Sequence, residues 1–273
     1  MKNILFAFSL TLLAGLSTGI GSGIAFFAKK TNTRFLSVSL GFSAGVMIYV
    51  SMIEIFPEAR NTLARELGLK AGSWATVIAF FGGVLLMALI DKWVPSEENP
   101  HSMYKIEEID DPDKIEDLQS QANSSLLRTG KFTALAVGIH NFPEGLATFI
   151  AALQDPSIAI PIAVAIAIHN IPEGIAVSVP VYYATGDKKK AFIYSFMSGL
   201  SEPIGALVGY LILMPFINDF IFGIVFAGIA GIMVYISLDE LLPTAQEYGE
   251  HHLSIYGLIG GMGVMALSLL LFL

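Results

Sequence analysis

Cysteine is absent from this chain of 273 residues, and charged residues are scarce. Without cysteine there are neither disulfides nor thiolate metal ligands, and the redox environment of the protein is left undetermined. Charged residues make up 14% of the sequence, whereas a soluble domain usually has about 25%. Hydrophobic residues make up 54%, and the mean hydropathy is +0.68. The composition predicts an integral membrane protein that lies in the lipid bilayer, and nothing in it suggests binding to nucleic acid.

Long apolar runs follow one another along the chain. A helix needs roughly 20 apolar residues to cross the hydrocarbon core, and these runs lack the short alternating pattern of a barrel. We therefore predict an all-α fold with eight transmembrane helices, at residues 3–28, 35–57, 73–95, 131–153, 158–182, 191–213, 219–242 and 254–273. The first run could instead be a signal peptide. Its apolar character extends to Phe27 without a clear small-x-small cleavage site, which favours a retained helix.

One polar segment interrupts this pattern. Nine acidic residues fall between Glu97 and Asp117, and such a block of like charge favours a solvated, flexible segment. We predict a flexible loop at 96–130 that joins helices 1–3 (residues 1–95) to helices 4–8 (residues 131–273) within one domain. With eight spans, eleven Lys and Arg residues lie on the side of this loop and four on the other. The positive-inside rule then places the loop in the cytoplasm and both termini outside, in a multi-pass protein of the cytoplasmic membrane.

Two copies of one motif lie inside the most apolar regions. Residues 140–145 read HNFPEG and residues 169–174 read HNIPEG. At about 100° per helical residue, Glu144 points between His140 and Asn141, one turn further along. His169, Asn170 and Glu173 repeat this arrangement. Each glutamate can thus offer one oxygen to a metal shared with histidine and the other to a metal shared with asparagine, which suits one ion or an adjacent pair.

The depth of these residues strengthens the case for a metal site. Both motifs lie near the centre of their predicted spans, and Glu202, in the sequence SEP, lies at the centre of the next span. Ionisable residues at this depth are costly unless they face partners or an ion. Pro143 and Pro172 lack an N–H, so each leaves the backbone carbonyl four residues earlier without its helical hydrogen bond. An unpaired carbonyl at membrane depth occurs only where protein or a water-filled cavity covers it. Alternatively, these residues only form hydrogen bonds between helices. The duplication of the whole motif at one depth favours a metal site over this alternative.

The donor types indicate which ions fit. Imidazole with carboxylate suits zinc, iron, manganese and cobalt, and the absence of thiolate favours exchangeable binding. Ser51 and Glu54 lie three residues apart in the second span, on one helical face. They indicate either an access path to the site or simply the water interface. Asp239 and Glu240, near the end of the seventh span, indicate an interfacial position.

With HNFPEG, HNIPEG and SEP on three consecutive predicted helices, the sequence resembles the ZIP family of divalent-metal transporters, most of all its bacterial zinc-uptake branch. The resemblance implies uptake of zinc, with iron, manganese and cobalt as further cargo, without a resident cofactor or enzymatic activity. It implies two adjoining metal positions. One is formed by Glu144, His169 and Glu173 with His140 nearby, and the other by Asn141, Glu144, Asn170, Glu173 and Glu202. It also implies a homodimer and a helix group that slides with its metal.

One departure limits the resemblance. Many family members carry a histidine-rich loop between spans three and four, whereas the loop predicted here is acidic and contains only His101. A histidine-based metal collector is therefore not expected. Two other functions remain open from the residues alone: a membrane-embedded di-metal enzyme, and a secondary carrier of an organic ion that uses the same polar cluster.

Overall fold

The computed structural model describes residues 2–25, 33–93, 112–154, 156–213, 216, 218–248 and 251–271, and for some of these only the backbone. The long elements in the described residues are all helical, which confirms the all-α prediction. The α-helices are α1 (Lys2–Ala25), α2 (Thr33–Val50), α3 (Phe56–Leu67), α4 (Leu69–Trp93), α5 (Pro112–Gln154), α6 (Pro156–Thr185), α7 (Lys188–Gly199), α8 (Ser201–Val208), α9 (Asp219–Ile236), α10 (Leu242–Tyr248) and α11 (His251–Leu271). Three short π-helical turns join some of them, at η1 (Ser51–Ile55), η3 (Gly209–Leu213) and η5 (Ser237–Leu241).

Most of the predicted spans are helices of the expected length. Among the described residues, seven helical segments are long and apolar enough to cross a membrane. The remaining predicted span, 131–153, forms the C-terminal part of α5. Helix α5 begins at Pro112, inside the segment predicted as a flexible loop. Proline suits the first turn of a helix, and the next glycine or proline is Gly130, so nothing in this stretch stops the helix. The rest of the predicted loop, to residue 111, lies outside the described residues.

The sixth predicted span is not one continuous helix. Helix α7 ends at Gly199, Leu200 forms a turn, and α8 begins at Ser201. Pro203 lacks an N–H and cannot donate to the carbonyl four residues earlier, which is that of Gly199. The break therefore lies one turn before the proline, and it places Glu202 in the first turn of a new helix.

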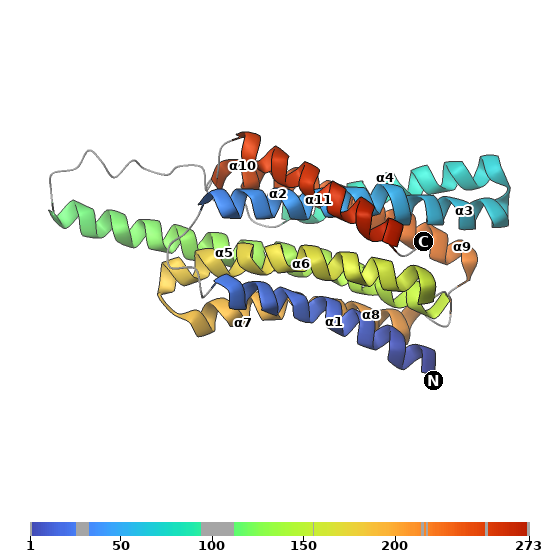
Figure 1. The fold of residues 1–273 in the computed structure, drawn as a ribbon, viewed down its shortest axis with the longest axis horizontal. Helices are drawn as coiled ribbons and strands as arrows, with labels where there is room; N and C mark the ends of the chain where they lie inside the picture. The colour runs from blue at the N-terminus through green and yellow to red at the C-terminus, as the bar shows by residue number, and fades with distance from the viewer. Residues whose placement is uncertain are drawn as a thin grey trace.

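The helices form two groups that lie side by side (Figure 1). The first group contains α1, α5, α6, α7 and α8, and the second contains α2, α3, α4, α9, α10 and α11. Between the groups, the main contacts are those of α2 with α6 and of α5 with α9. Both HN-P-E-G motifs and Glu202 belong to the first group.

Glycines let the helices within each group approach closely. A methyl group at Gly145 of α5 would overlap the carbonyl oxygen of Glu202 in α8, and one at Gly45 of α2 would overlap that of Leu258 in α11. Small residues at helix crossings commonly allow such approach in membranes. Among the described residues, every glycine with this kind of backbone contact meets a helix of its own group. Each group is thus closely interlocked, whereas no described glycine makes such a contact across the surface between the groups.

A short sequence repeat lies at the junction of α2 with α3 and again at the junction of α9 with α10. Residues 51–59 read SMIEIFPEA and residues 237–245 read SLDELLPTA. Each copy opens with a π-helical turn, and a proline follows in the first turn of the next α-helix. The turn η1 contacts α9 while η5 contacts α2, so the two copies pack reciprocally. Such π turns often occur at functional sites.

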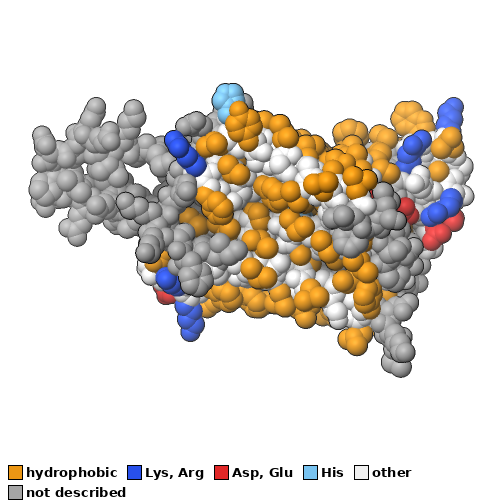
Figure 2. Space-filling view, viewed as in Figure 1, with side chains coloured by type: hydrophobic (Ala, Val, Ile, Leu, Met, Phe, Trp, Pro, Cys, Tyr) orange, Lys and Arg blue, Asp and Glu red, His pale blue; other side chains and the backbone are white. Residues whose placement is uncertain are grey.

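The surface agrees with a position in lipid. Hydrophobic side chains cover the central part of the face in Figure 2, and the described charged side chains visible there lie toward the two ends of the molecule. Helix α4 is the least buried of the candidate spans, with large apolar side chains such as Phe81 and Leu85 on its outer face. In water these residues would form an unfavourable apolar patch, whereas in a bilayer they face a medium of the same kind.

Candidate metal site

Six of the predicted ligands lie on three neighbouring helices of the first group. Asn141 and Glu144 lie on α5, His169, Asn170 and Glu173 lie on α6, and Glu202 lies on α8. The side chains of all six have 0% of their surface exposed. Helices α5 and α6 continue through Pro143 and Pro172. The backbone of His140 is part of α5, but its side chain lies outside the described residues.

Two contacts join the motifs across helices. Nε2 of His169 lies 3.2 Å from Oε2 of Glu144, which connects α6 to α5. Nδ2 of Asn170 donates to Oε1 of Glu202, which connects α6 to α8. The structure therefore brings together four of the predicted ligands, as one pair between α5 and α6 and one pair between α6 and α8.

The asparagine amides are anchored to backbone carbonyls. Nδ2 of Asn141 donates to the carbonyl oxygen of Ser198 at 3.3 Å, and Nδ2 of Asn170 donates to that of Ala14 at 3.0 Å. While these nitrogens donate to backbone, Oδ1 of each amide is buried and accepts no hydrogen bond from a described residue. Carbonyl-type oxygens of this kind are ligands for hard divalent cations.

Several of these oxygens are buried without a donor. Within the described part of the chain, no hydrogen bond reaches Oδ1 of Asn141, Oδ1 of Asn170, Oε1 of Glu144 or Oε2 of Glu202. Leaving a buried acceptor unpaired costs about 1–3 kcal/mol, and more when the group is charged. Moreover, no Lys or Arg side chain is buried among the described residues. A cation bound among these oxygens would give the acceptors a partner and would balance the charge of the buried carboxylates.

Among the predicted ligands whose side chains are described, the contacts join pairs and no closed coordination shell is formed. Among the described residues, no group of three or more His, Asp or Glu side chains is arranged so that it could hold a metal ion. The donor set nevertheless fits a divalent metal, because imidazole, amide and carboxylate converge from three helices. Rotation of the carboxylates would be required to complete a coordination shell.

One contact to this site comes from the second group. Oγ of Ser43, on α2, donates to Oε1 of Glu173 at 3.2 Å and lies 3.4 Å from the backbone oxygen of His169. The sequence gives little sign of this contact, because Ser43 lies 130 positions from Glu173. Ser43 is a small polar residue near the centre of an apolar span, and such residues often form hydrogen bonds between helices. This is the only feature of the sequence that indicates a role for it.

The predicted access residues lie on the second group. Ser51 opens the π-helical turn η1, and its buried Oγ has no hydrogen-bond partner in the described part of the structure. Glu54 is half-buried and lies near Glu58. Thr148, which the sequence analysis did not single out, is buried one turn beyond Glu144 and has an unpartnered hydroxyl within the described residues. Asp239 is exposed and Glu240 half-buried, in agreement with an interfacial position.

Comparison with known proteins gives a consistent result. The family model for the ZIP zinc transporter matches residues 95–269, which include α5, α6 and α8. The chain is 65% identical to the zinc transporter ZupT of Clostridium perfringens over 280 aligned positions, covering 100% of this chain and 98% of the relative. It is 65% identical to that of Streptococcus mutans, covering 99% of each chain, and 64% identical to that of Nitratidesulfovibrio vulgaris, covering 99% and 98%.

Proposed function

The chain belongs to the ZIP family of zinc transporters, and from this we propose that it carries zinc into the cell through the buried site on α5, α6 and α8. The observation that supports the proposal best is the set of buried acceptor oxygens without donors, in a region with no buried Lys or Arg among the described residues. Its relatives are named as transporters and not as enzymes. We infer that the metal is cargo and that the protein needs no cofactor.

We propose that the site contains two adjoining metal positions that share glutamates. Zinc binds Glu144, His169 and Glu173, with His140 nearby. The second position uses Asn141, Glu144, Asn170, Glu173 and Glu202, and its harder oxygen donors extend the cargo to iron, manganese and cobalt. The contact of His169 with Glu144 and that of Asn170 with Glu202 support this division, because each pair joins residues of one position.

Transport also requires that the site open to each side in turn. We propose that the first helix group moves relative to the second and carries the metal with it. This is supported by the glycine contacts, which interlock helices within a group. The hydrogen bond from Ser43 to Glu173 crosses between the groups, so it would break and form again during the movement.

We propose that the metal reaches the site past Glu54 and Ser51 on the second group. An anionic side chain at the mouth of a buried site raises the local cation concentration. Glu54→Gln is therefore expected to raise the KM for zinc uptake about threefold to tenfold at low ionic strength, with kcat unchanged. Glu66→Gln, at an exposed position of α3, is the matched control. An unchanged KM for Glu54→Gln would remove Glu54 from the access path.

The orientation and assembly remain proposals from the sequence and the family. The protein lies in the cytoplasmic membrane with both termini outside, because Lys and Arg are concentrated in the segments expected inside. It forms a homodimer, as its family resemblance implies. The segment 96–130 connects the first three spans to the last five on the cytoplasmic side.

Zinc entry into liposomes that contain the purified protein tests the function. We expect saturable zinc uptake that empty liposomes lack, with smaller uptake of iron, manganese and cobalt. An enzyme would bind metal without moving it across the bilayer. A carrier of an organic ion would show proton or sodium dependence without metal flux. Either result would exclude metal transport.

A further inference from the structure

A groove separate from the metal site lies between α4 and the junction of α9 with η5. It has a volume of about 280 Å³ and is lined by Phe80, Phe81, Val84, Val234, Tyr235, Leu238 and Asp239. Phe81 is 61% exposed and Leu238 is 54% exposed, so the groove opens on the outer surface of the bundle. All of its lining residues belong to segments that are long and apolar enough to cross a membrane. We therefore expect the groove to face lipid.

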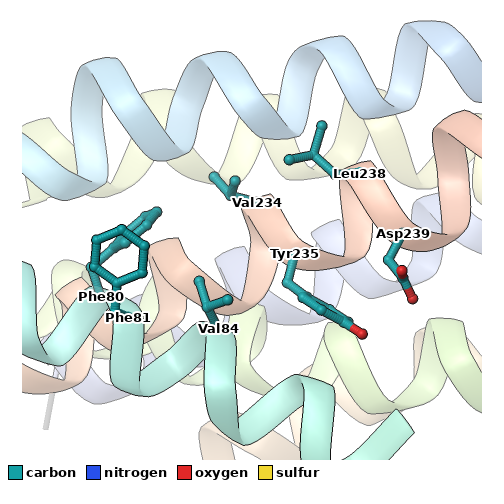
Figure 3. Close-up of a pocket in the computed structure, with 7 residues that line it drawn as sticks. All are labelled: Phe80, Phe81, Val84, Val234, Tyr235, Leu238 and Asp239. Atoms are coloured by element: carbon teal, nitrogen blue, oxygen red, sulfur yellow. The ribbon is translucent and has the colours of Figure 1, made fainter.

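The groove is apolar at one end and polar at the other. Figure 3 shows the rings of Phe80 and Phe81 at one end, and the hydroxyl of Tyr235 and the carboxylate of Asp239 together at the other. The remaining lining side chains are aliphatic. An amphipathic molecule with an apolar tail and a polar head matches this distribution.

The polar end lies where lipid headgroups are expected. About 20 residues of helix separate Asp219, at the start of α9, from Asp239. At 1.5 Å per residue this is about 30 Å, which is about the thickness of the hydrocarbon core. With Asp219 at one interface, Asp239 lies at the other, and the apolar end of the groove extends into the acyl-chain region.

Asp239 lines this polar end, and we expect Lys92, which carries the opposite charge, to lie just beyond it on α4. Asp239 is exposed, and its carboxylate has no hydrogen bond or ion pair with any described residue. Lys92, near the end of α4, is also exposed and without such a partner in the described part of the chain. Lys92 follows Phe81 by about three helical turns, which brings it to the same face of α4, beyond the polar end of the groove.

We propose that this groove binds one phospholipid whose headgroup carries a primary ammonium, such as phosphatidylethanolamine. An acyl chain fills the space between Phe81 and Leu238. The headgroup phosphate pairs with Lys92, and the ammonium donates to Asp239. A choline headgroup has the same charge but no N–H donor, so it forms the weaker contact at Asp239.

Native mass spectrometry of the full-length protein, delipidated in detergent and titrated with defined lipids, tests this proposal. We expect one phosphatidylethanolamine to be retained about fivefold more strongly than phosphatidylcholine of the same chain length. Asp239→Asn is expected to abolish this preference, and Lys92→Gln to weaken both lipids alike. Asp219→Asn, which removes a carboxylate at the other end of α9, is expected to retain the preference.

A second pair of variants separates binding in the groove from general solvation by lipid. Leu238→Trp fills the groove and is expected to lower retention of phosphatidylethanolamine at least about fivefold. Leu207→Trp, at an exposed position of α8, is expected to have no effect. Equal retention by wild type, Asp239→Asn and Leu238→Trp would overturn the proposal. So would conversion of a dimer to a monomer by Leu238→Trp without loss of lipid, because a second copy of the chain would then occupy the groove.

Discussion

Replacing Glu173 by alanine is expected to abolish zinc uptake into liposomes. Glu173 is fully buried, belongs to both proposed metal positions and accepts a hydrogen bond from Ser43 of the other helix group. Loss of an outer-shell partner of a metal ligand typically costs 10–100-fold in affinity. Loss of a shared ligand is therefore expected to lower uptake more than about 100-fold. The alanine also removes one of three buried like charges, so folding is expected to be retained.

The matched control is Glu66→Ala, at an exposed position of α3, for which uptake is expected to equal that of wild type. Thermal unfolding of both purified variants checks that each is folded. Ser43→Ala removes the hydrogen bond to Glu173 and the contact with the backbone oxygen of His169 but keeps every predicted ligand, so it is expected to lower uptake severalfold without abolishing it. Wild-type uptake by a folded Glu173→Ala protein would show that zinc does not pass through this site.

Gly145→Ala is expected to reduce both stability and transport. The added methyl group would overlap the carbonyl oxygen of Glu202, and backbone atoms cannot move aside as a flexible side chain can. Overpacking of a well-packed interior typically costs about 1–3 kcal/mol, and we expect the upper end of this range. Since α5 and α8 both carry predicted ligands, their separation is also expected to lower zinc uptake at least about tenfold.

Gly82→Ala provides the control, because a methyl group at this position of α4 meets no atom within 4 Å. Alanine is favoured over glycine in a helix interior by about 1 kcal/mol, so this variant is expected to be as stable as wild type or more so. The measurement is the midpoint of thermal unfolding in detergent, followed by uptake. Equal midpoints for Gly145→Ala and Gly82→Ala would contradict the close contact of α5 with α8.

The metal site could be predicted because the positions of its residues follow from local helical spacing, which does not depend on how the helices pack. A histidine, asparagine and glutamate at fixed helical spacing, repeated at the same depth, predicted that these side chains would meet. The structure buries six of the predicted ligands completely, and it joins His169 to Glu144 and Asn170 to Glu202. The ZIP family predicted from the two motifs is confirmed. The metal positions themselves stay predictions, because the described side chains meet in pairs.

The features that the sequence did not reveal have different physical causes. Ser43 reaches Glu173 only because α2 packs on α6, and nothing near Ser43 in the sequence indicates this. The break at Leu200 follows from Pro203, yet the apolar run continues through it and reads as one span. The acidic composition of residues 112–130 favoured a loop, so the start of α5 at Pro112 was not predicted. The same residues are mostly good helix formers, and this preference determines the structure there.

Anomalous X-ray scattering at the zinc edge from crystals of the zinc-loaded protein tests the central claim most directly. We expect the strongest peak among α5, α6 and α8, about 2.0–2.2 Å from a nitrogen of His169 and from oxygens of Glu144 and Glu173. The peak should disappear in Glu173→Ala crystals. A strongest peak elsewhere, with none among these three helices, would contradict the assignment of this buried cluster as the site through which the metal passes.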